Sequence, residues 1–281
     1  MIGGLADDRP QGRARAAPVA STRRLFLALL RPYQVDLVCD IGSMDGSDAL
    51  RFRQRVPEAQ VVAFEANPDN FTRMRANALL AGNRVQVEPL AVCEQDGSAD
   101  FFVVRVDDPA AHARRGMSSL YRRAEDDQLD RVLRVATTRL DSYIARQAPR
   151  ARRLALWIDV EGKAFEVIDG ARGILEHVAI IHVEVETRPL IGASQKTWAE
   201  VGARLREAGF VELATDHAAT GLQFNVLYVR MPEAGPARNA LRLRLHLEKW
   251  RRRGTNLVYN LLPGRVRGAL MARYRIRGSI G

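Results

Sequence analysis

Short apolar runs alternate with helical patterns over the middle of the chain. Apolar runs typical of buried strands fall at 35–40, 60–65, 85–89, 154–159 and 179–186. Amphipathic helical patterns lie between most of them, at 47–56, 69–81, 140–146 and 163–175. Alternation of this kind predicts right-handed βαβ units. We therefore expect a doubly wound α/β fold, with a mostly parallel sheet covered by helices on both faces.

The end of this region predicts an antiparallel edge. A further helix is expected at 196–208, followed by strand patterns at 210–215 and 222–230 that a short turn region joins. Two strands joined in this way form a hairpin at one edge of the sheet. A second hairpin is expected near 97–106, where 99–106 has a strand pattern.

Three segments do not fit the alternation. The opening stretch 1–21 is rich in Gly, Pro and Arg without a hydrophobic period, which predicts a mobile N-terminal arm. The polar segment 107–134 is a substrate lid or a surface insertion, because long loops inside a compact domain are often functional. The expected organisation is an arm at 1–21, one domain at 22–232 with the insert or lid at 107–134, and a basic tail at 233–281.

The positive charge of the chain belongs to that tail. The whole sequence has 43 Lys+Arg against 33 Asp+Glu, a net charge of +10, and the residues before Met231 are balanced. A basic amphipathic tail suits an anionic membrane surface or an acidic partner. The alternative is a pair of helices packed on the domain with arginines outward. Nucleic acid is a less favoured partner, since the body is neutral and the tail has no recognised nucleic-acid fold.

Composition narrows the class of protein. With 47% apolar and 27% charged residues the chain is an ordinary globular protein, not a disordered or fibrous one. No apolar run approaches the roughly 20 residues needed to cross a bilayer. The two cysteines, Cys39 and Cys93, make no disulfide framework and fit a reducing cytosol. We expect a cytoplasmic protein, which the tail could bring to the inner membrane face.

The first strand pattern ends in a glycine turn that predicts a cofactor site. The turn contains Gly42 and Gly46, and glycines let a chain turn tightly and let a ligand approach the backbone. This G-x-x-x-G spacing differs from the G-x-G-x-x-G of dinucleotide sites and disfavours NAD. Asp40 would repel a phosphate and attract a cation, so S-adenosylmethionine suits the turn better. Glu65, at the end of the next strand, can accept hydrogen bonds from both ribose hydroxyls. The alternative is a plain turn and a solvated strand-end acid.

Two later strands carry acids where a buried strand should be apolar. Asp159 and Glu161 are two positions apart, which predicts one face. His182, Glu184 and Glu186 also share one side of their strand. Unpaired charges in a sheet core are costly, so these groups must reach a cleft, a cation or one another. Alternatively, Asp159 or Glu161 caps the following helix, and His182 is a hydrogen-bonded core histidine.

Four stretches of the sequence resemble the FkbM-type family of S-adenosylmethionine-dependent methyltransferases. They are Asp40-Ile41-Gly42-x-x-x-Gly46, Phe64-Glu65-Ala66-Asn67-Pro68, Thr138-Arg139-Leu140-Asp141, and the run from Ile158-Asp159-Val160-Glu161-Gly162-Lys163 to Ala171. The last is close to the family pattern D-V-E-G-x-E-x-x-V-L-x-G-A. The resemblance spans about 35–230 and implies the seven-stranded, Rossmann-like methyltransferase fold. The chain departs from the family at Asp45 (often Asn), Ala66 (often Pro) and Phe165 (often Glu, here Glu166 beside it).

The resemblance implies methyl transfer, usually to a hydroxyl oxygen of a sugar, glycan or secondary metabolite. The expected cofactor-binding residues are Asp40, Gly42, Ser43, Asp45, Gly46, Glu65, Ala66 and Asn67. A hydroxyl is a poor nucleophile until its proton begins to leave, so a general base is needed. Asp159 is the first choice for that base and Glu161 the second.

Other residues are expected around the acceptor. Glu184 is a candidate for binding acceptor hydroxyls, and Ser118 and Ser119 match a serine-containing stretch of the family that lines the site. A hard cation such as Mg²⁺ held by Asp159, Glu161 and Glu184 is a less favoured alternative.

Two rival functions stay open. An RNA methyltransferase would use the tail as a phosphate clamp, with binding that weakens steeply in salt. A non-catalytic protein that kept the fold would bind S-adenosylmethionine without transferring its methyl group.

Overall fold

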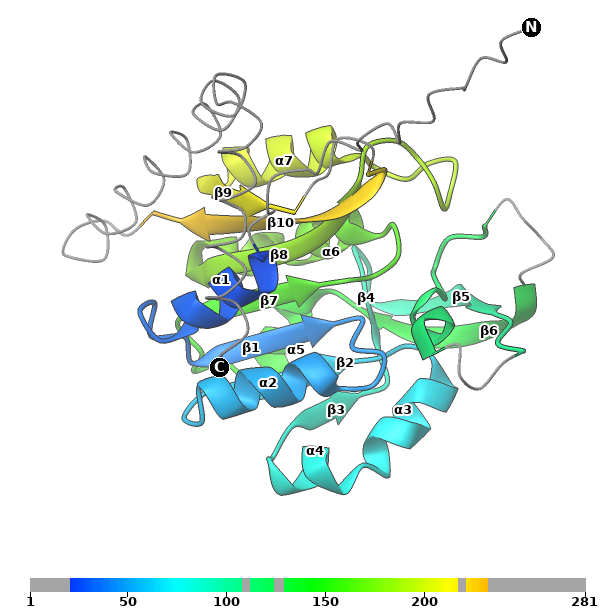
Figure 1. Ribbon diagram of the computed structural model, residues 1–281, viewed down its shortest axis with the longest axis horizontal. Helices are drawn as coiled ribbons and strands as arrows, with labels where there is room; N and C mark the ends of the chain where they lie inside the picture. Colours follow the sequence, from blue (N-terminus) through cyan, green and yellow to red (C-terminus); the bar gives the residue numbers. More distant parts are fainter. Residues whose placement is uncertain (1–20, 108–111, 124–128, 217–220, 232–281) are drawn as a thin grey trace, which may run out of the picture.

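A twisted seven-stranded sheet runs through the centre of the computed structural model, which describes residues 21–107, 112–123, 129–216 and 221–231 (Figure 1). The strand order is β3-β2-β1-β7-β8-β10-β9. The bounds are β1 (Leu37–Ile41), β2 (Gln60–Phe64), β3 (Gln86–Glu88), β7 (Leu154–Ile158), β8 (Val178–Glu186), β9 (Phe210–Thr215) and β10 (Gln223–Arg230). The expected α/β fold is confirmed.

The parallel part of the sheet has its edge hairpin where the sequence places it. Strands β3, β2, β1, β7 and β8 are parallel, whereas β10 is antiparallel to both β8 and β9. The expected hairpin is therefore β9–β10, with a β-bulge between Leu227 and Tyr228.

Helices cover both faces of the sheet. Their bounds are α1 (Thr22–Leu30), α2 (Ser47–Arg55), α3 (Pro68–Arg75), α4 (Ala78–Gly82), α5 (Leu140–Gln147), α6 (Ala164–Gly170) and α7 (Trp198–Glu207), with 3-10 turns η1 (His112–Gly116) and η3 (Arg172–His177). Helices α1 and α2 lie in front of the sheet in Figure 1, and α5 and α6 lie behind it. Two large apolar clusters fill the two faces, as the doubly wound pattern requires.

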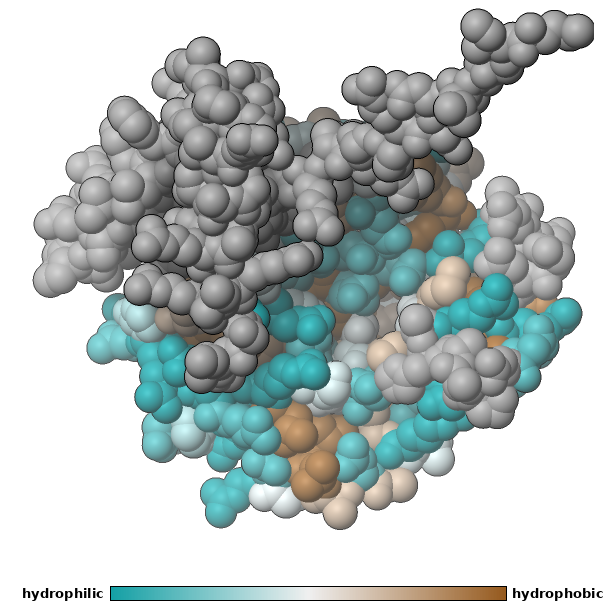
Figure 2. Space-filling view, in the orientation of Figure 1, coloured by the Kyte–Doolittle hydropathy of each residue, from teal (hydrophilic) through white to brown (hydrophobic). Residues whose placement is uncertain are grey.

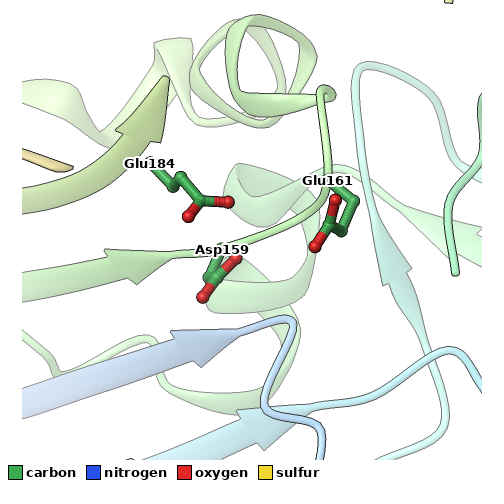
Figure 3. A group of neighbouring side chains, drawn as sticks. All are labelled: Asp159, Glu161 and Glu184. Atoms are coloured by element: carbon green, nitrogen blue, oxygen red, sulfur yellow. The ribbon is translucent and has the colours of Figure 1, made fainter. Parts of the chain in front are cut away.

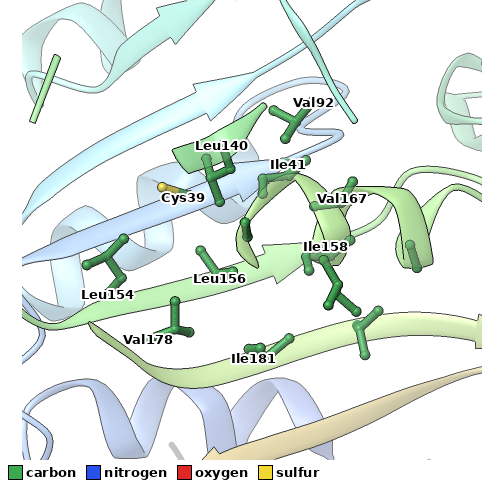
Figure 4. Packing of buried hydrophobic residues seen from close by; sticks show 14 of the residues in the cluster. Cys39, Ile41, Val92, Leu140, Leu154, Leu156, Ile158, Val167, Val178 and Ile181 are labelled. Atoms are coloured by element: carbon green, nitrogen blue, oxygen red, sulfur yellow. The ribbon is translucent and has the colours of Figure 1, made fainter. Parts of the chain in front are cut away.

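Alternate residues of each strand divide between these clusters. Leu37, Cys39 and Ile41 of β1 join the cluster under α5 and α6, together with Leu154, Leu156 and Ile158 of β7 (Figure 4). The residues between them, such as Val38 and Trp157, pack under α1 and α2. Phe26 of α1 is fully buried there, with its ring centroid 5.3 Å from that of Trp157.

A second sheet corrects the expectation for the polar segment. It has three strands in the order β4 (Ala91–Val92), β6 (Leu129–Thr138) and β5 (Gly97–Val104). The strand expected at 99–106 is present as β5, but the hairpin expected near 97–106 is wrong, because the antiparallel partner of β5 is β6, which begins only at Leu129. This start lies inside 107–134, which the sequence analysis assigned to an insert. Most of the first half of β6 is exposed, so it lacks the apolar pattern of a buried strand.

Two helical predictions need correction, and one helix was not predicted. The helix expected at 69–81 is two helices, since Asn77 caps α4 by accepting a hydrogen bond from the Leu79 amide. The helix expected at 163–175 is α6 followed by η3. Helix α1 had no counterpart in the sequence analysis.

The last features of the fold are the ends of the chain, the length of its helices and its outer surface. Residues 1–20 of the expected arm and all of the tail after Met231 lie outside the described residues. Where the structure is described, none of its helices has the length and apolarity that a membrane span requires. The surface over α2 and α3 is mainly hydrophilic (Figure 2).

Candidate functional site

The residues expected at the site form a row across four neighbouring strands. Ile41, the last residue of β1, pairs with Phe64 of β2 on one side and with Ile158 of β7 on the other. Ile158 in turn pairs with Val183 of β8. The next residue along each of these strands is, in order across the sheet, Glu65, Gly42, Asp159 and Glu184. Glu65, Gly42 and Asp159 therefore lie just beyond the carboxyl ends of their strands, and Glu184 lies near the end of the longer strand β8, at the edge where open α/β sheets bind ligands.

A glycine is required at position 42 because the backbone after β1 approaches the backbone after β7 closely here. Its φ is +83°, and a Cβ there would lie 1.8 Å from the backbone oxygen of Asp159. Gly46 has a φ of +78°, and a Cβ there would lie 2.6 Å from the Leu80 side chain. Protein atoms therefore occupy the space beside both glycines. Both glycines have the positive φ that the predicted tight turn requires, and Gly42 also lines the cavity described below.

Asp40 lies beneath the glycine turn. It is 1% exposed, and its Oδ2 accepts hydrogen bonds from Ser43 Oγ (2.6 Å) and from the Ala49 amide (3.1 Å). Burial raises the pKa of Asp40 to about 8, so the carboxyl is mainly protonated at neutral pH. These contacts tie the turn to the first turn of α2.

A cavity opens between the two sheets, with a volume of about 530 Å³ that is partly open to solvent. Its walls are mostly apolar, and the side chains that line it include Met44, Phe64, Leu90, Val92, Phe101 and Leu120. Its polar or charged lining residues are Glu65, Arg115, Ser118, Asp159 and Lys163.

Glu65 carries the main acceptor group of this cavity. It is 6% exposed, its Oε2 accepts a hydrogen bond from the Met44 amide (2.7 Å), and its Oε1 accepts one from the Asn67 amide (2.7 Å). Burial raises the pKa of Glu65 to about 7, against the opposing effect of these bonds. The Asn70 side chain also hydrogen-bonds this carboxylate, and the remaining acceptor capacity of Glu65 is available to a ligand hydroxyl.

The predicted cofactor residues divide into two groups. Gly42, Glu65 and Ala66 line the cavity. Asp40, Ser43, Asp45, Gly46 and Asn67 are not among its lining residues. Asp45 accepts a hydrogen bond from the Ser47 amide at the start of α2, and Asn67 caps α3 by accepting one from the Asp69 amide. This second group shapes the loops that carry the first.

The three predicted catalytic acids lie together (Figure 3). One carboxylate oxygen of each of Asp159, Glu161 and Glu184 lies within 4.8 Å of the other two. Asp159 also lines the cavity, so it belongs to both groups. Burial raises the pKa of all three carboxyls. The neighbouring carboxylates raise that of Glu184 further, so Glu184 keeps its proton at neutral pH.

The reason for this convergence differs from the expected one. Asp159 and Glu161 follow β7 instead of belonging to it, and Glu161 has a φ of +49°, so strand alternation does not place them. Helix capping does not explain them either, because Lys163 occupies the N-cap position of α6 and no side chain caps that helix.

His182 is a core residue. It is 2% exposed, its ring stacks on Trp157 with centroids 3.5 Å apart, and its Nε2 lies 3.0 Å from Thr22 Oγ1. Burial lowers the pKa of His182 to about 3, which keeps the ring neutral. The alternative of a hydrogen-bonded core histidine is confirmed.

The two serines both lie at the site, one in the wall of the cavity and one on the backbone of the turn that carries the acids. Ser118 lines the cavity, and its Oγ accepts a hydrogen bond from the Val104 amide (3.1 Å). Ser119 Oγ donates to the carbonyl oxygen of Glu161 (2.8 Å).

Sequence reasoning missed several residues of the site. Met44, Arg115, Leu120 and Lys163 line the cavity, and Arg123 forms an ion pair with Glu161. Lys163 lies inside the motif that carries Asp159, and Met44 lies inside the glycine turn, so both could have been found there. No pattern in the sequence marks Arg115, Leu120 or Arg123.

The seven-stranded sheet, the edge hairpin and the cavity at the strand ends define a Rossmann-like methyltransferase fold. The model of the "Methyltransferase FkbM domain" matches residues 40–212, more than half of the chain. The chain therefore belongs to the FkbM methyltransferase family. The chain is also 29% identical, over 175 residues, to the 2-O-methyltransferase NoeI of Sinorhizobium fredii (strain NBRC 101917 / NGR234). That match covers 60% of this chain and 70% of NoeI.

Solved structures show more distant likeness. The magnesium protoporphyrin IX methyltransferase ChlM from Synechocystis PCC 6803, with bound SAH, is 13% identical with a TM-score of 0.42. That match covers 74% of this chain and 81% of ChlM. The N-terminal domain of EvdMO1, determined in the presence of SAH and D-fucose, is 14% identical with a TM-score of 0.39. Here 76% of this chain and 84% of that one are covered.

Proposed function

We propose that this chain transfers the methyl group of S-adenosylmethionine to a hydroxyl oxygen of a sugar, a glycan or a secondary metabolite. One observation carries the proposal: Asp159 is both a wall of the cavity that contains Glu65 and a member of the acidic cluster. A proton acceptor thus lies where a cofactor and an acceptor would meet. The relative described as a 2-O-methyltransferase supports oxygen as the methylated atom.

The cavity residues fit the adenosine part of this cofactor. Glu65 offers its remaining acceptor capacity to the ribose hydroxyls, and the apolar side chains of Phe64, Leu90 and Val92 line the same cavity. The cofactor would supply the electrophilic methyl group. The task of the protein is then to hold the acceptor oxygen in line with that group, because orientation supplies a large part of such a rate increase.

Asp159 is suited to take the proton of the acceptor hydroxyl as its oxygen attacks. Its raised pKa makes the carboxylate a stronger base than an exposed aspartate. Glu184 keeps a proton, so it can donate a hydrogen bond to Asp159 or to an acceptor oxygen. Gln223 Nε2 donates to Glu184 Oε2 (2.7 Å) and fixes that side chain. We assign the base to Asp159 and acceptor binding to Glu184.

A divalent cation on the acidic cluster remains the less favoured alternative. Three carboxylates would suit a hard cation such as Mg²⁺. However, Arg123 already donates to Glu161 Oε2, which takes up part of the donor set. This ion pair favours the proposal without a metal.

The proposal is tested by transfer of labelled methyl groups. The protein is incubated with labelled S-adenosylmethionine and a cell extract, which is then fractionated into glycans, lipids, RNA and small molecules. We expect label in a glycan or small-molecule fraction, in a product that resists mild base as an ether does. Label confined to RNA would favour the nucleic-acid alternative. A calorimetric titration that detects no S-adenosylmethionine binding would contradict both enzyme functions.

The Asp159→Asn variant tests the base. We expect it to lose about 10²–10⁴-fold in turnover while its affinity for S-adenosylmethionine stays close to that of the wild type, since general base catalysis contributes that much. Asp130→Asn, at an exposed acid of β6, is the matched control and should keep full activity. If Asp159→Asn retains wild-type turnover, the assignment of the base is wrong.

A further inference from the structure

We propose that Arg123 is a positioning residue, which holds the Glu161 carboxylate in place beside Asp159 and Glu184. Arg123 belongs to residues 117–123, here called the 117–123 segment, and this segment as a whole holds the turn between β7 and α6 in place. The inference rests on the proposed function. It gives a catalytic task to part of the polar segment 107–134, for which the sequence left open a lid or an insertion.

The contacts of Arg123 hold its guanidinium in one orientation. Nη2 donates to Glu161 Oε2 at 2.7 Å, while Nη2 and Nε donate to the Met117 carbonyl oxygen at 2.8 and 3.2 Å. The two side chains of the ion pair are only 19% and 16% exposed. Solvent therefore screens this pair less than a surface ion pair. Because the guanidinium group is planar and rigid, the two hydrogen bonds to the Met117 carbonyl oxygen also fix the direction of the Nη2 bond to Glu161.

The backbone of Glu161 also needs this support. Its φ of +49° is uncommon for a residue with a side chain, and it persists only where the surroundings hold it. Ser119 Oγ donates to the Glu161 carbonyl oxygen at 2.8 Å and accepts from the Tyr121 amide at 2.9 Å. The 117–123 segment thus binds Glu161 twice, once at the backbone and once at the carboxylate.

The segment is anchored independently of Glu161. Tyr121 OH donates to Glu166 Oε1 of α6 at 2.6 Å, and Lys163 Nζ lies 4.1 Å from the centroid of the Tyr121 ring. Gly192, in the loop after β8, packs so closely that a Cβ there would lie 2.6 Å from that ring. Since Tyr121 is held from two other elements, the segment can fix the position of Glu161 in turn.

The charges around Glu161 make Arg123 the important partner. Asp159 on the same turn, and Glu184 and Glu186 of β8, are the acids that face it, and Gln223 of β10 is the neutral donor. Burial raises the pKa of Glu161, and the charge of Arg123 opposes that rise. Without Arg123 the pKa of Glu161 should rise further, and the proton would stay on Glu161 to a higher pH.

Two substitutions of Arg123 separate charge from geometry. Arg123→Gln removes the charge, and Arg123→Lys keeps it but loses the rigid fork. Arg114→Gln changes an exposed arginine of the same polar segment and is the control. Three quantities are measured for each variant. The first is the titration of the Glu161 carboxyl carbon by ¹³C NMR, whose signal is assigned by its loss in Glu161→Gln. The second is the affinity for S-adenosylmethionine. The third is the pH profile of kcat/KM, measured with the extract fraction that accepts label.

We expect Arg123→Gln to titrate Glu161 at higher pH. The loss of a positive charge beside the acidic cluster should also move the acid limb of the profile, which the base Asp159 sets, to higher pH. The kcat/KM of Arg123→Gln should fall by up to about 10²-fold, since a small misplacement at the acidic cluster can cost that much, while cofactor affinity changes little. Arg123→Lys should restore the titration and only part of the rate. Arg114→Gln should match the wild type throughout.

The outcomes separate this inference from the proposed function. An unchanged Glu161 titration and an unchanged rate in Arg123→Gln would contradict the role of Arg123 and leave the proposed function standing. A wild type that binds S-adenosylmethionine but labels no fraction would contradict the proposed function, and the positioning role with it. If Arg123→Gln does not fold, as thermal unfolding shows, Arg123→Lys still decides. Full activity with an unaltered pH profile in Arg123→Lys would then contradict the claim that the rigid guanidinium positions Glu161.

Discussion

At the scale of single residues, Glu65 links cofactor binding to pH. Its carboxylate lines the cavity, and burial raises its pKa to about 7. The ionised form is the stronger acceptor for ribose hydroxyls. Since a raised pKa means that the proton is still bound below pH 7, we expect the affinity for S-adenosylmethionine to fall as the pH drops through about 7. Calorimetry on either side of that pH, at about pH 6 and about pH 8, measures this.

The Glu65→Gln variant should lose both the affinity and its pH dependence. A hydrogen bond to a charged group is worth about 1.5–3 kcal/mol, so about 10–100-fold weaker binding is expected on the alkaline side. Glu58→Gln, at an exposed acid before β2, should bind like the wild type under both conditions. Equal affinity of the wild type on both sides of neutral pH would show that Glu65 does not accept from the cofactor in its ionised form.

Some of these residues could be predicted from sequence and others could not, for a physical reason. Asp159, Glu161 and Glu184 were identifiable because acids next to buried strands are costly unless they have a task. The same reasoning misassigned their geometry, since Glu161 lies beyond the strand in a left-handed conformation that no alternation predicts. Arg123 was missed because it comes from a polar segment, and only the folded chain brings it to Glu161.

At the scale of elements, the contact between the β1–α2 turn and the β7–α6 turn determines the site. The Gly42→Ala variant should be destabilised by more than about 2 kcal/mol, because it combines a clash with a positive φ. The clash is with the Asp159 carbonyl, 1.8 Å from the added Cβ. Urea unfolding measures the loss. The fraction of Gly42→Ala that still folds should also have a lower turnover, since relief of the clash moves Asp159.

Gly82 offers the matched control. It lies at the end of α4, and a Cβ there would meet nothing within 4 Å. Gly82→Ala should leave stability unchanged or raise it by about 0.4–1 kcal/mol through the unfolded state. Equal stability of the two alanine variants would mean that the close approach at Gly42 is not a constraint.

The elements themselves were predictable where burial imposes a period. The strands of the main sheet lie within two residues of their predicted limits, because both of their faces are buried. Strand β6 was missed because Asp130, Arg131 and Arg134 leave half of it polar. Helix α1 was missed although Phe26 packs against Phe52 and Trp157, since its six-residue apolar run lacks the spacing of an amphipathic helix.

At the scale of the whole molecule, the charge of the chain and the site belong to different regions. The net charge of +10 comes from residues 231–281, whereas the described acidic cluster lies at the strand ends of a neutral body. Nothing in the catalytic proposal uses the tail. We therefore propose that the tail brings the enzyme to an anionic membrane surface.

Sedimentation with lipid vesicles tests this proposal. We expect the full chain to bind vesicles that contain phosphatidylserine, to bind pure phosphatidylcholine vesicles weakly, and to dissociate as salt is raised. Replacing Arg251, Arg252 and Arg253 with glutamine should weaken binding by about 3 kcal/mol, since each basic residue near such a surface contributes about 1 kcal/mol. Methyl transfer to a water-soluble acceptor should be unchanged.

The control replaces three exposed arginines of the body, Arg24, Arg105 and Arg152, and leaves the tail intact. If attraction depended on net charge alone, both triple variants would lose the same amount of vesicle binding, because each loses three charges. We expect the body variant to bind like the wild type, since screening limits attraction to charges within about 8–10 Å of the surface. Equal losses, or equal binding to both kinds of vesicle, would contradict the membrane role. Tight binding of RNA that falls steeply with salt would instead favour the nucleic-acid alternative for the tail.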